Sequence, residues 1–190
     1  MTKYSHCPAC GKPYGSAAAG SDAPRPDLLL CSSCGFHFWQ NSKPAVAALV
    51  VRASPSGPQI LLSLRGAEPF RGLWDFPGGF LSNGEMPEDG LARELREELD
   101  VQVLRPRLFG FGIDEYPADG IAEQGRFVLS IFYRCDIPPD AKLSARDDVA
   151  EVRWFPIAAP PRLAFPSNVQ TLQDLVRALN QESTGRHAGS

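Results

Sequence analysis

The sequence has no long apolar run and no basic character. No stretch approaches the roughly 18 apolar residues of a membrane-spanning helix, and the start, MTKYSHCPACG, lacks the basic segment and apolar run of a secretory signal. We therefore expect a soluble, cytoplasmic protein that does not bind membranes. The formal net charge is -3 over 190 residues, whereas binding through nucleic-acid phosphates favours a basic surface. The charge balance therefore argues against a nucleic-acid partner.

Apolar runs are also scarce within residues 1–43, although the whole chain is 43% hydrophobic. This stretch is rich in Gly, Ala, Pro and Ser, so it cannot bury much surface by itself and needs an added constraint to fold. Four of the five cysteines lie there in two Cys-x-x-Cys pairs, Cys7 with Cys10 and Cys31 with Cys34. Such pairs indicate a metal site in a reducing compartment rather than a disulfide framework.

The spacing of the two pairs is typical of a structural zinc site. Twenty residues separate Cys10 from Cys31, at the upper end of the usual range, and a glycine after each pair lets the backbone curl around an ion. Four thiolates leave zinc no open position, so the site would fold residues 1–43 rather than catalyse. Two alternatives stay open: reduced or redox-active cysteine pairs, or replacement of a thiolate by His6 or His37.

Hydrophobic periodicity predicts more strands than helices in the rest of the chain. A helix is expected from about Glu85 to Leu99, because Pro87 suits a first-turn position and leucines recur every fourth residue. A second amphipathic helix is expected over about residues 167–180. Apolar runs bounded by turn residues predict strands at 45–51, 59–65, 74–80, 101–109, 127–135 and 150–155.

The first of these helices gathers three glutamates on one side. At about 100° per residue, Glu94, Glu97 and Glu98 fall within an arc of roughly 100°, beside an apolar face. Their mutual repulsion costs helix stability, and a divalent cation would remove that cost. Oxygen-only ligands suit hard ions such as Mg²⁺, which also bridge to substrate phosphates. Charge pattern alone favours the simpler interpretation, a solvated face whose glutamates pair with Arg93 and Arg96.

A longer motif favours the metal site over the solvated helix face. The run from Gly79 to Val101, GFLSNGEMPEDGLARELREELDV, matches the Nudix signature G-x5-E-x7-R-E-U-x-E-E-x-G-U (U apolar) at every position but one. The exception is Asp100, in place of a glycine that ends the helix. Aspartate tolerates a left-handed conformation, so we expect little effect on catalysis. With its cysteine pairs, the chain resembles Nudix hydrolases that carry a zinc ribbon, the arrangement of NADH pyrophosphatases.

This resemblance implies an α/β fold, a Nudix α/β/α sandwich around a mixed sheet with a small N-terminal zinc ribbon. The expected domains are the ribbon at residues 1–43, the Nudix hydrolase domain at 44–180 and a polar, disordered tail at 181–190. The implied activity is hydrolysis of a diphosphate bond, dependent on Mg²⁺ or Mn²⁺, in a nucleotide-type small molecule. Nudix enzymes commonly dimerise, so a homodimer is one expectation.

The resemblance also assigns residues to a catalytic metal site. Glu94, Glu97 and Glu98 would bind the metal, and one of them would help to activate water. The carbonyl group of Gly79 would assist them as a further ligand of the metal. Family members often add an acid from a later loop, for which Asp148 in DDVAEVRW is our candidate. The alternates for this acid are Asp147 and Glu151, with Glu115 and Glu123 as weaker candidates.

Other residues are expected to support this site or to bind the substrate. Glu85 would pair with Arg93 and fix the helix. Arg65 and Arg71 are candidates to bind a phosphate oxygen, although each is as typical of an ordinary surface cation. Aromatic residues after the signature are candidates to stack on a base, although aromatic residues at a strand end more often belong to the core. They are Phe109, Phe111 and Tyr116.

The substrate is less constrained than the reaction. The NADH pyrophosphatases carry a Ser-Gln-Pro-Trp block after the signature, where this sequence has FGFGIDEYP at residues 109–117. The activity on nicotinamide dinucleotides therefore does not transfer. An ADP-ribose-like compound, another nucleoside-diphosphate derivative or dinucleotide, FAD and coenzyme A all stay open.

Two other functions fit the same scaffold. A catalytically silent Nudix domain would act as a nucleotide sensor or regulator whose ribbon contacts a partner or nucleic acid, but the intact glutamates argue against it. A diphosphate isomerase would need a reactive cysteine. The spare cysteine, Cys135, lies in the apolar run FVLSIFYRC, which is typical of an inert buried thiol.

Overall fold

The computed structural model describes residues 5–14, 28–116 and 126–187. The chain divides into two compact units, residues 1–42 with 115–127 and residues 43–114 with 128–190. The predicted domain limits, 1–43 and 44–180, stay predictions. Within the described residues, no helix combines the length and apolarity that a membrane crossing requires.

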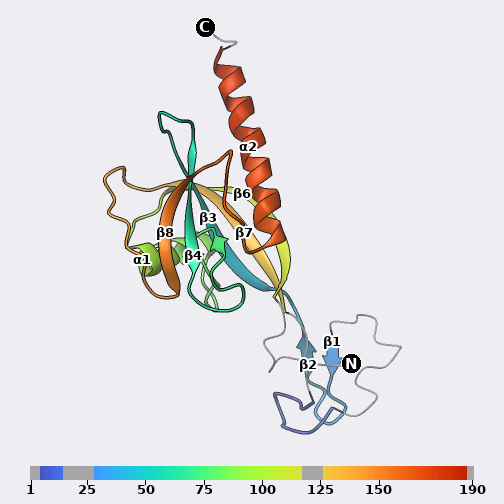
Figure 1. Ribbon diagram of the computed structural model, residues 1–190. Helices are drawn as coiled ribbons and strands as arrows, with labels where there is room; N and C mark the ends of the chain where they lie inside the picture. Colours follow the sequence, from blue (N-terminus) through green and yellow to red (C-terminus); the bar gives the residue numbers. More distant parts are fainter. Residues whose placement is uncertain (1–4, 15–27, 117–125, 188–190) are drawn as a thin grey trace. The chain divides into compact units, whose positions relative to one another are not determined.

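The larger unit is built on a six-stranded mixed sheet (Figure 1). Its strand order is β5-β4-β3-β7-β6, and β8 pairs with β4. Strands β3 and β7 run parallel, whereas β4 is antiparallel to β3, β5 and β8. The strands are β3 (Lys43–Arg52), β4 (Gln59–Arg65), β5 (Trp74–Asp75), β6 (Leu104–Tyr116), β7 (Arg126–Asp136) and β8 (Val149–Pro156).

Strand β3 shows how the sheet separates two cores. Because successive side chains of a strand point to opposite faces, Val46, Ala48 and Val50 pack with the leucines of helix α1 (Pro87–Leu99). Leu49 instead belongs to the cluster on helix α2 (Pro166–His187). The sheet therefore lies between the two helices, which confirms the predicted α/β/α sandwich.

A loop rather than a strand accompanies the middle of β3. Near the hairpin turn, Val51 and Arg52 pair with β4. Farther back, the backbone N–H groups of Val46 and Ala48 donate to the carbonyl groups of Gly79 and Pro77, each at 2.9 Å. The predicted strand over 74–80 is thus regular only at Trp74–Asp75, because Pro77 and the glycines after it interrupt the extended backbone.

Strand β6 starts later and ends later than predicted. The expected range was 101–109, but Asp100 adopts a left-handed conformation (φ 58°) and ends α1, and β6 begins at Leu104. In the second half of the strand, Gly112 packs against Phe132 and Ser167, where a larger side chain would not fit, and the strand continues to Tyr116.

The prediction of a disordered tail at 181–190 is wrong for residues 181–187. Helix α2 does not stop near residue 180 but continues through His187, and residues 188–190 lie outside the described part. The hydroxyl groups of Ser183 and Thr184 donate to carbonyl groups one turn earlier, each at 2.9 Å. Glu182 forms an ion pair with Arg134 of β7. These polar contacts extend the helix where the apolar pattern has ended.

The smaller unit contains two short hairpins that carry the cysteines. Strands β1 (Leu28–Leu30) and β2 (His37–Trp39) pair antiparallel around the second cysteine pair. An isolated bridge between His6 and Pro13 closes the hairpin of the first pair. The glycine after each pair has positive φ, 71° at residue 11 and 75° at residue 35, as the sequence predicted for knuckles that curl around an ion.

Candidate functional site

Glu98 of α1 is buried against the loop that accompanies β3. Its residue is 6% exposed, and its Oε2 accepts a hydrogen bond of 2.9 Å from the backbone N–H of Gly78. Burial, opposed by the bond from Gly78 and reinforced by the nearby charges of Asp148 and Glu94, raises the pKa of Glu98 to about 9. A carboxylate in this setting is stabilised by a cation.

Glu94 lies one turn earlier and shares this environment. A Cβ atom on Gly79 would lie 2.6 Å from the Cδ and Oε1 atoms of Glu94, so the absence of a side chain at residue 79 makes room for the carboxylate. Burial raises the pKa of Glu94, and the charge of Asp148 adds to the rise. The Gly79 carbonyl, a predicted metal ligand, accepts from Val46 but keeps a second lone pair.

Asp148, the candidate for the later-loop acid, has a charge that raises the pKa of both Glu94 and Glu98. It is exposed, and its own carbonyl accepts a hydrogen bond of 2.7 Å from the N–H of Gly66. The two alternates lie differently, since Asp147 is an exposed turn residue with φ 54° and Glu151 pairs with Arg153. The effect of Asp148 on the pKa of both glutamates is consistent with its predicted role as a further acid of the metal site.

Arg93 joins the loop before α1 to the helix. It donates from Nε and Nη2 to both carboxylate oxygens of Glu85, at 2.8 and 2.9 Å, and from Nη2 to the Phe80 carbonyl at 3.0 Å. The bonds from Arg93 and from the backbone of residue 82 lower the pKa of Glu85 to about 2. Nη1 contacts Glu94 at 2.8 Å and the half-exposed Glu97 at 2.9 Å.

The two arginines proposed as phosphate ligands are held by the protein itself. Arg65 donates to the Pro69 carbonyl and to Asp75 Oδ2, each at 2.8 Å, and its side chain is 16% exposed. Arg71 is exposed and donates to the Gly66 carbonyl at 2.6 Å. Arg65 therefore supports the protein's own structure through its bonds to Pro69 and Asp75. Binding of a substrate phosphate by Arg65 or Arg71 stays a prediction.

Asp75 is a partly buried acidic residue near this site that sequence reasoning missed. Its Oδ1 accepts from the Phe76 N–H at 2.8 Å and from the Asn168 amide, and Oδ2 accepts from Arg65. Burial raises the pKa of Asp75, and its charge contributes to the raised pKa of Glu98. An aspartate within the apolar run WDFPGGF was the available signal.

The remaining candidates differ in burial, and one of them lies outside the described residues. Phe109 packs partly buried in the α2 core, whereas Phe111 is 63% exposed on β6. Cys135 is 4% exposed, and burial raises the pKa of its thiol to about 12, in keeping with an inert thiol. Tyr116 and Glu115 end β6, and Glu123 lies outside the described residues.

The four N-terminal cysteines form a cluster of their own. Their sulfur atoms all lie within 4.8 Å of one another, with Cys7 to Cys34 at 3.7 Å and Cys10 to Cys31 at 3.8 Å. Tetrahedral zinc with bonds of about 2.3 Å would place its sulfur ligands about 3.8 Å apart. The donor set and its spacing therefore fit a structural zinc ion.

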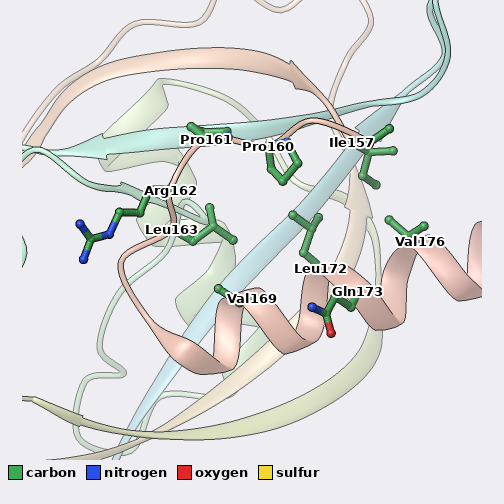
Figure 2. A pocket seen from close by; sticks show the side chains of 10 residues that line it. Ile157, Pro160, Pro161, Arg162, Leu163, Val169, Leu172, Gln173 and Val176 are labelled. Atoms are coloured by element: carbon green, nitrogen blue, oxygen red, sulfur yellow. The ribbon is translucent and has the colours of Figure 1, made fainter.

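An apolar cavity lies between α2 and the segment that precedes it (Figure 2). Its volume is about 580 Å³, and Ile157, Leu163, Leu172 and Val176 are among its lining residues. In Figure 2 the guanidinium of Arg162 points away from the other labelled side chains. The cavity is on the α2 side of the sheet, so it is separate from the carboxylates of α1.

Comparison with known proteins identifies relatives along most of the chain. The NUDIX domain family model matches residues 42–175. The chain is 24% identical over 174 residues to the NAD-capped RNA hydrolase NudC of Pseudomonas fluorescens, covering 91% of this chain and 56% of that protein. It is 32% identical over 122 residues to the ADP-ribose pyrophosphatase of Methanocaldococcus jannaschii, covering 64% of this chain and 68% of that protein.

Solved structures show the same fold. A NUDIX hydrolase from Nitrosomonas europaea aligns with a TM-score of 0.64 at 23% identity, covering 98% of this chain and 94% of that chain. The NUDIX domain of Shewanella oneidensis NrtR, complexed with ADP ribose, aligns with a TM-score of 0.61 at 22% identity, covering 74% and 90%. The chain spans just over half of the NudC relative's length.

Proposed function

The chain belongs to the Nudix family, and on that basis we propose that it hydrolyses a diphosphate bond in a nucleoside-diphosphate-linked small molecule. Glu94, Glu97 and Glu98 would hold Mg²⁺ or Mn²⁺, with Asp148 as a further acid. The observation that carries this proposal is a pair of neighbouring carboxylates, the buried Glu98 and the partly buried Glu94, whose pKa values are raised. Such a cluster is stable in its charged form when a cation neutralises it.

The metal ion and the residues around it would have different roles in the hydrolysis. A bound divalent ion would neutralise charge on the diphosphate and acidify the attacking water. The Gly78 N–H holds one oxygen of Glu98, so this carboxylate is oriented before any substrate binds. Arg93 forms ion pairs with Glu94 and Glu97. Attack on one phosphorus would yield two phosphorylated products.

An ADP-ribose-like compound is our first choice of substrate. Two relatives support it, the pyrophosphatase from Methanocaldococcus jannaschii by its name and the NrtR domain by its bound ADP ribose. NudC relatives named as NAD-capped RNA hydrolases make a dinucleotide the second choice, because the Ser-Gln-Pro-Trp block is replaced by FGFGIDEYP here. In the smaller unit, we propose that zinc binds the four cysteines and stabilises the ribbon.

The test compares Glu98→Gln with Glu88→Gln, the same change at an exposed position of α1. Each protein is incubated with Mg²⁺ or Mn²⁺ and a panel of ADP-ribose, NADH, FAD and coenzyme A, and phosphomonoester products are measured. We expect Glu98→Gln to lower kcat by at least about 100-fold and Glu88→Gln to act like the wild type. Equal turnover by both variants would refute the site. Tight binding of ADP-ribose without turnover by the wild type would favour a sensor.

A further inference from the structure

The first cysteine hairpin places Tyr14 next to Cys7. The N–H of Tyr14 donates to the Ser5 carbonyl at 2.9 Å, and the N–H of Cys7 donates to the Lys12 carbonyl at 2.8 Å. His6 and Pro13 form the bridge between these pairs. Because side chains two residues apart on an extended strand point to the same face, Tyr14 and Cys7 share one face of the hairpin as diagonal neighbours.

The hydroxyl group of Tyr14 is buried beside these sulfur atoms. It has no hydrogen-bond partner among the described residues, and it is the one buried side-chain oxygen or nitrogen in them for which this holds. Burial raises the pKa of Tyr14, and the charge of Cys7 and a side-chain interaction with Cys7 raise it further, so the hydroxyl lies close to this sulfur atom although the two do not form a well-aligned hydrogen bond. A buried hydroxyl without a partner is costly and needs an explanation.

We propose that Tyr14 is a positioning residue of the zinc site, whose phenolic O–H donates a hydrogen bond to the Cys7 sulfur when the four thiolates hold zinc. This inference rests on the zinc site proposed above, not on the hydrolase activity. A metal-bound thiolate is negatively charged and accepts hydrogen bonds, and donors around a metal site commonly orient the ligands and strengthen binding. Donation to Cys7 would satisfy the hydroxyl and reduce the repulsion among the thiolates.

The test is the zinc affinity of the full-length chain, measured by competition with a chelator of known affinity. Tyr14→Phe removes one oxygen and keeps the ring, and we expect it to weaken zinc binding by about 10-fold or more. A hydroxyl that is buried without a role predicts the opposite, because its removal would leave the affinity unchanged or increase it. Tyr133→Phe makes the same change at a buried tyrosine of the larger unit and should leave the affinity unchanged.

Cobalt substitution gives a second measurement, the absorption spectrum of the metal site, which a change in packing alone would not alter. In the Co²⁺-loaded protein, Tyr14→Phe should shift the sulfur-to-cobalt charge-transfer band, and Tyr133→Phe should not. Tyr14→Leu, which lacks both ring and hydroxyl, measures the contribution of packing. Wild-type affinity and spectrum in Tyr14→Phe, with weakening only in Tyr14→Leu, would overturn the proposal. A wild-type chain that binds no zinc would also overturn it, whatever the outcome of the hydrolase assay.

Discussion

Replacing Gly79 with alanine should impair catalysis while sparing the fold. The new Cβ atom would lie 2.6 Å from the Glu94 carboxylate, about 0.8 Å closer than the 3.4 Å at which ordinary contact begins. The residue needs no positive φ, and the obstacle is the end of a flexible side chain. The carboxylate should therefore move while the backbone stays in place, and the free energy of unfolding should change by less than about 1 kcal/mol.

A ligand displaced by this distance no longer fits the geometry of a metal site, where distances are held to within about 0.2 Å. Misplacements near 1 Å can lower rates about 100-fold, so we expect a loss of that size in kcat/KM and a higher Mg²⁺ requirement. Gly110→Ala is the matched control, because a Cβ there meets nothing within 4 Å. If the two variants hydrolyse ADP-ribose equally well, Gly79 does not make room for a ligand and our reasoning is wrong.

Three further predictions concern α1. Leu95→Ala, at a residue with 0% exposure, should lower the free energy of unfolding in urea by about 2–5 kcal/mol, whereas Val169→Ala, at an exposed residue, should change it little. In metal-free protein, wild-type stability should fall as pH rises from 4.5 toward about 9, because the buried Glu98 carboxyl takes up a proton on folding. Glu98→Gln should lack this contribution, and identical pH profiles in urea unfolding would contradict the raised pKa. Arg93→Lys keeps the charge but loses the paired bonds to Glu85, so kcat/KM should fall by about 10–100-fold, and undiminished activity would show that the pair is dispensable.

The elements that could be predicted from the sequence are those with a local signal. Leucines at every fourth residue identified α1, and its predicted C-terminal boundary at Leu99 agrees with the structure. Cysteine spacing likewise predicted a cluster that the structure brings together. The helix depends on residues close together in the chain, and each cysteine pair on a short turn, whereas the meeting of the two pairs follows from the shared need of four thiolates for one ion.

The features that the sequence did not predict depend on contacts between distant residues. Asp75 is stabilised by Asn168, which lies 93 residues later, and no local pattern marks that pair. Within the unpredicted second half of β6, Gly112 packs closely against Ser167 of α2, a contact that no local pattern marks. The end of α2 is held in part by Arg134 of β7, which composition alone does not reveal.

The start of α2 connects two strands that are far apart in the sheet order. Ser167 bonds to Asp114 of β6, and the next residue, Asn168, bonds to Asp75 of β5. These strands stand at opposite ends of the order β5-β4-β3-β7-β6. The beginning of one helix therefore ties both ends of that order through side-chain hydrogen bonds. A substitution that released Asn168 from Asp75 would remove a bond that holds β5, directly before the loop whose Gly78 N–H binds Glu98.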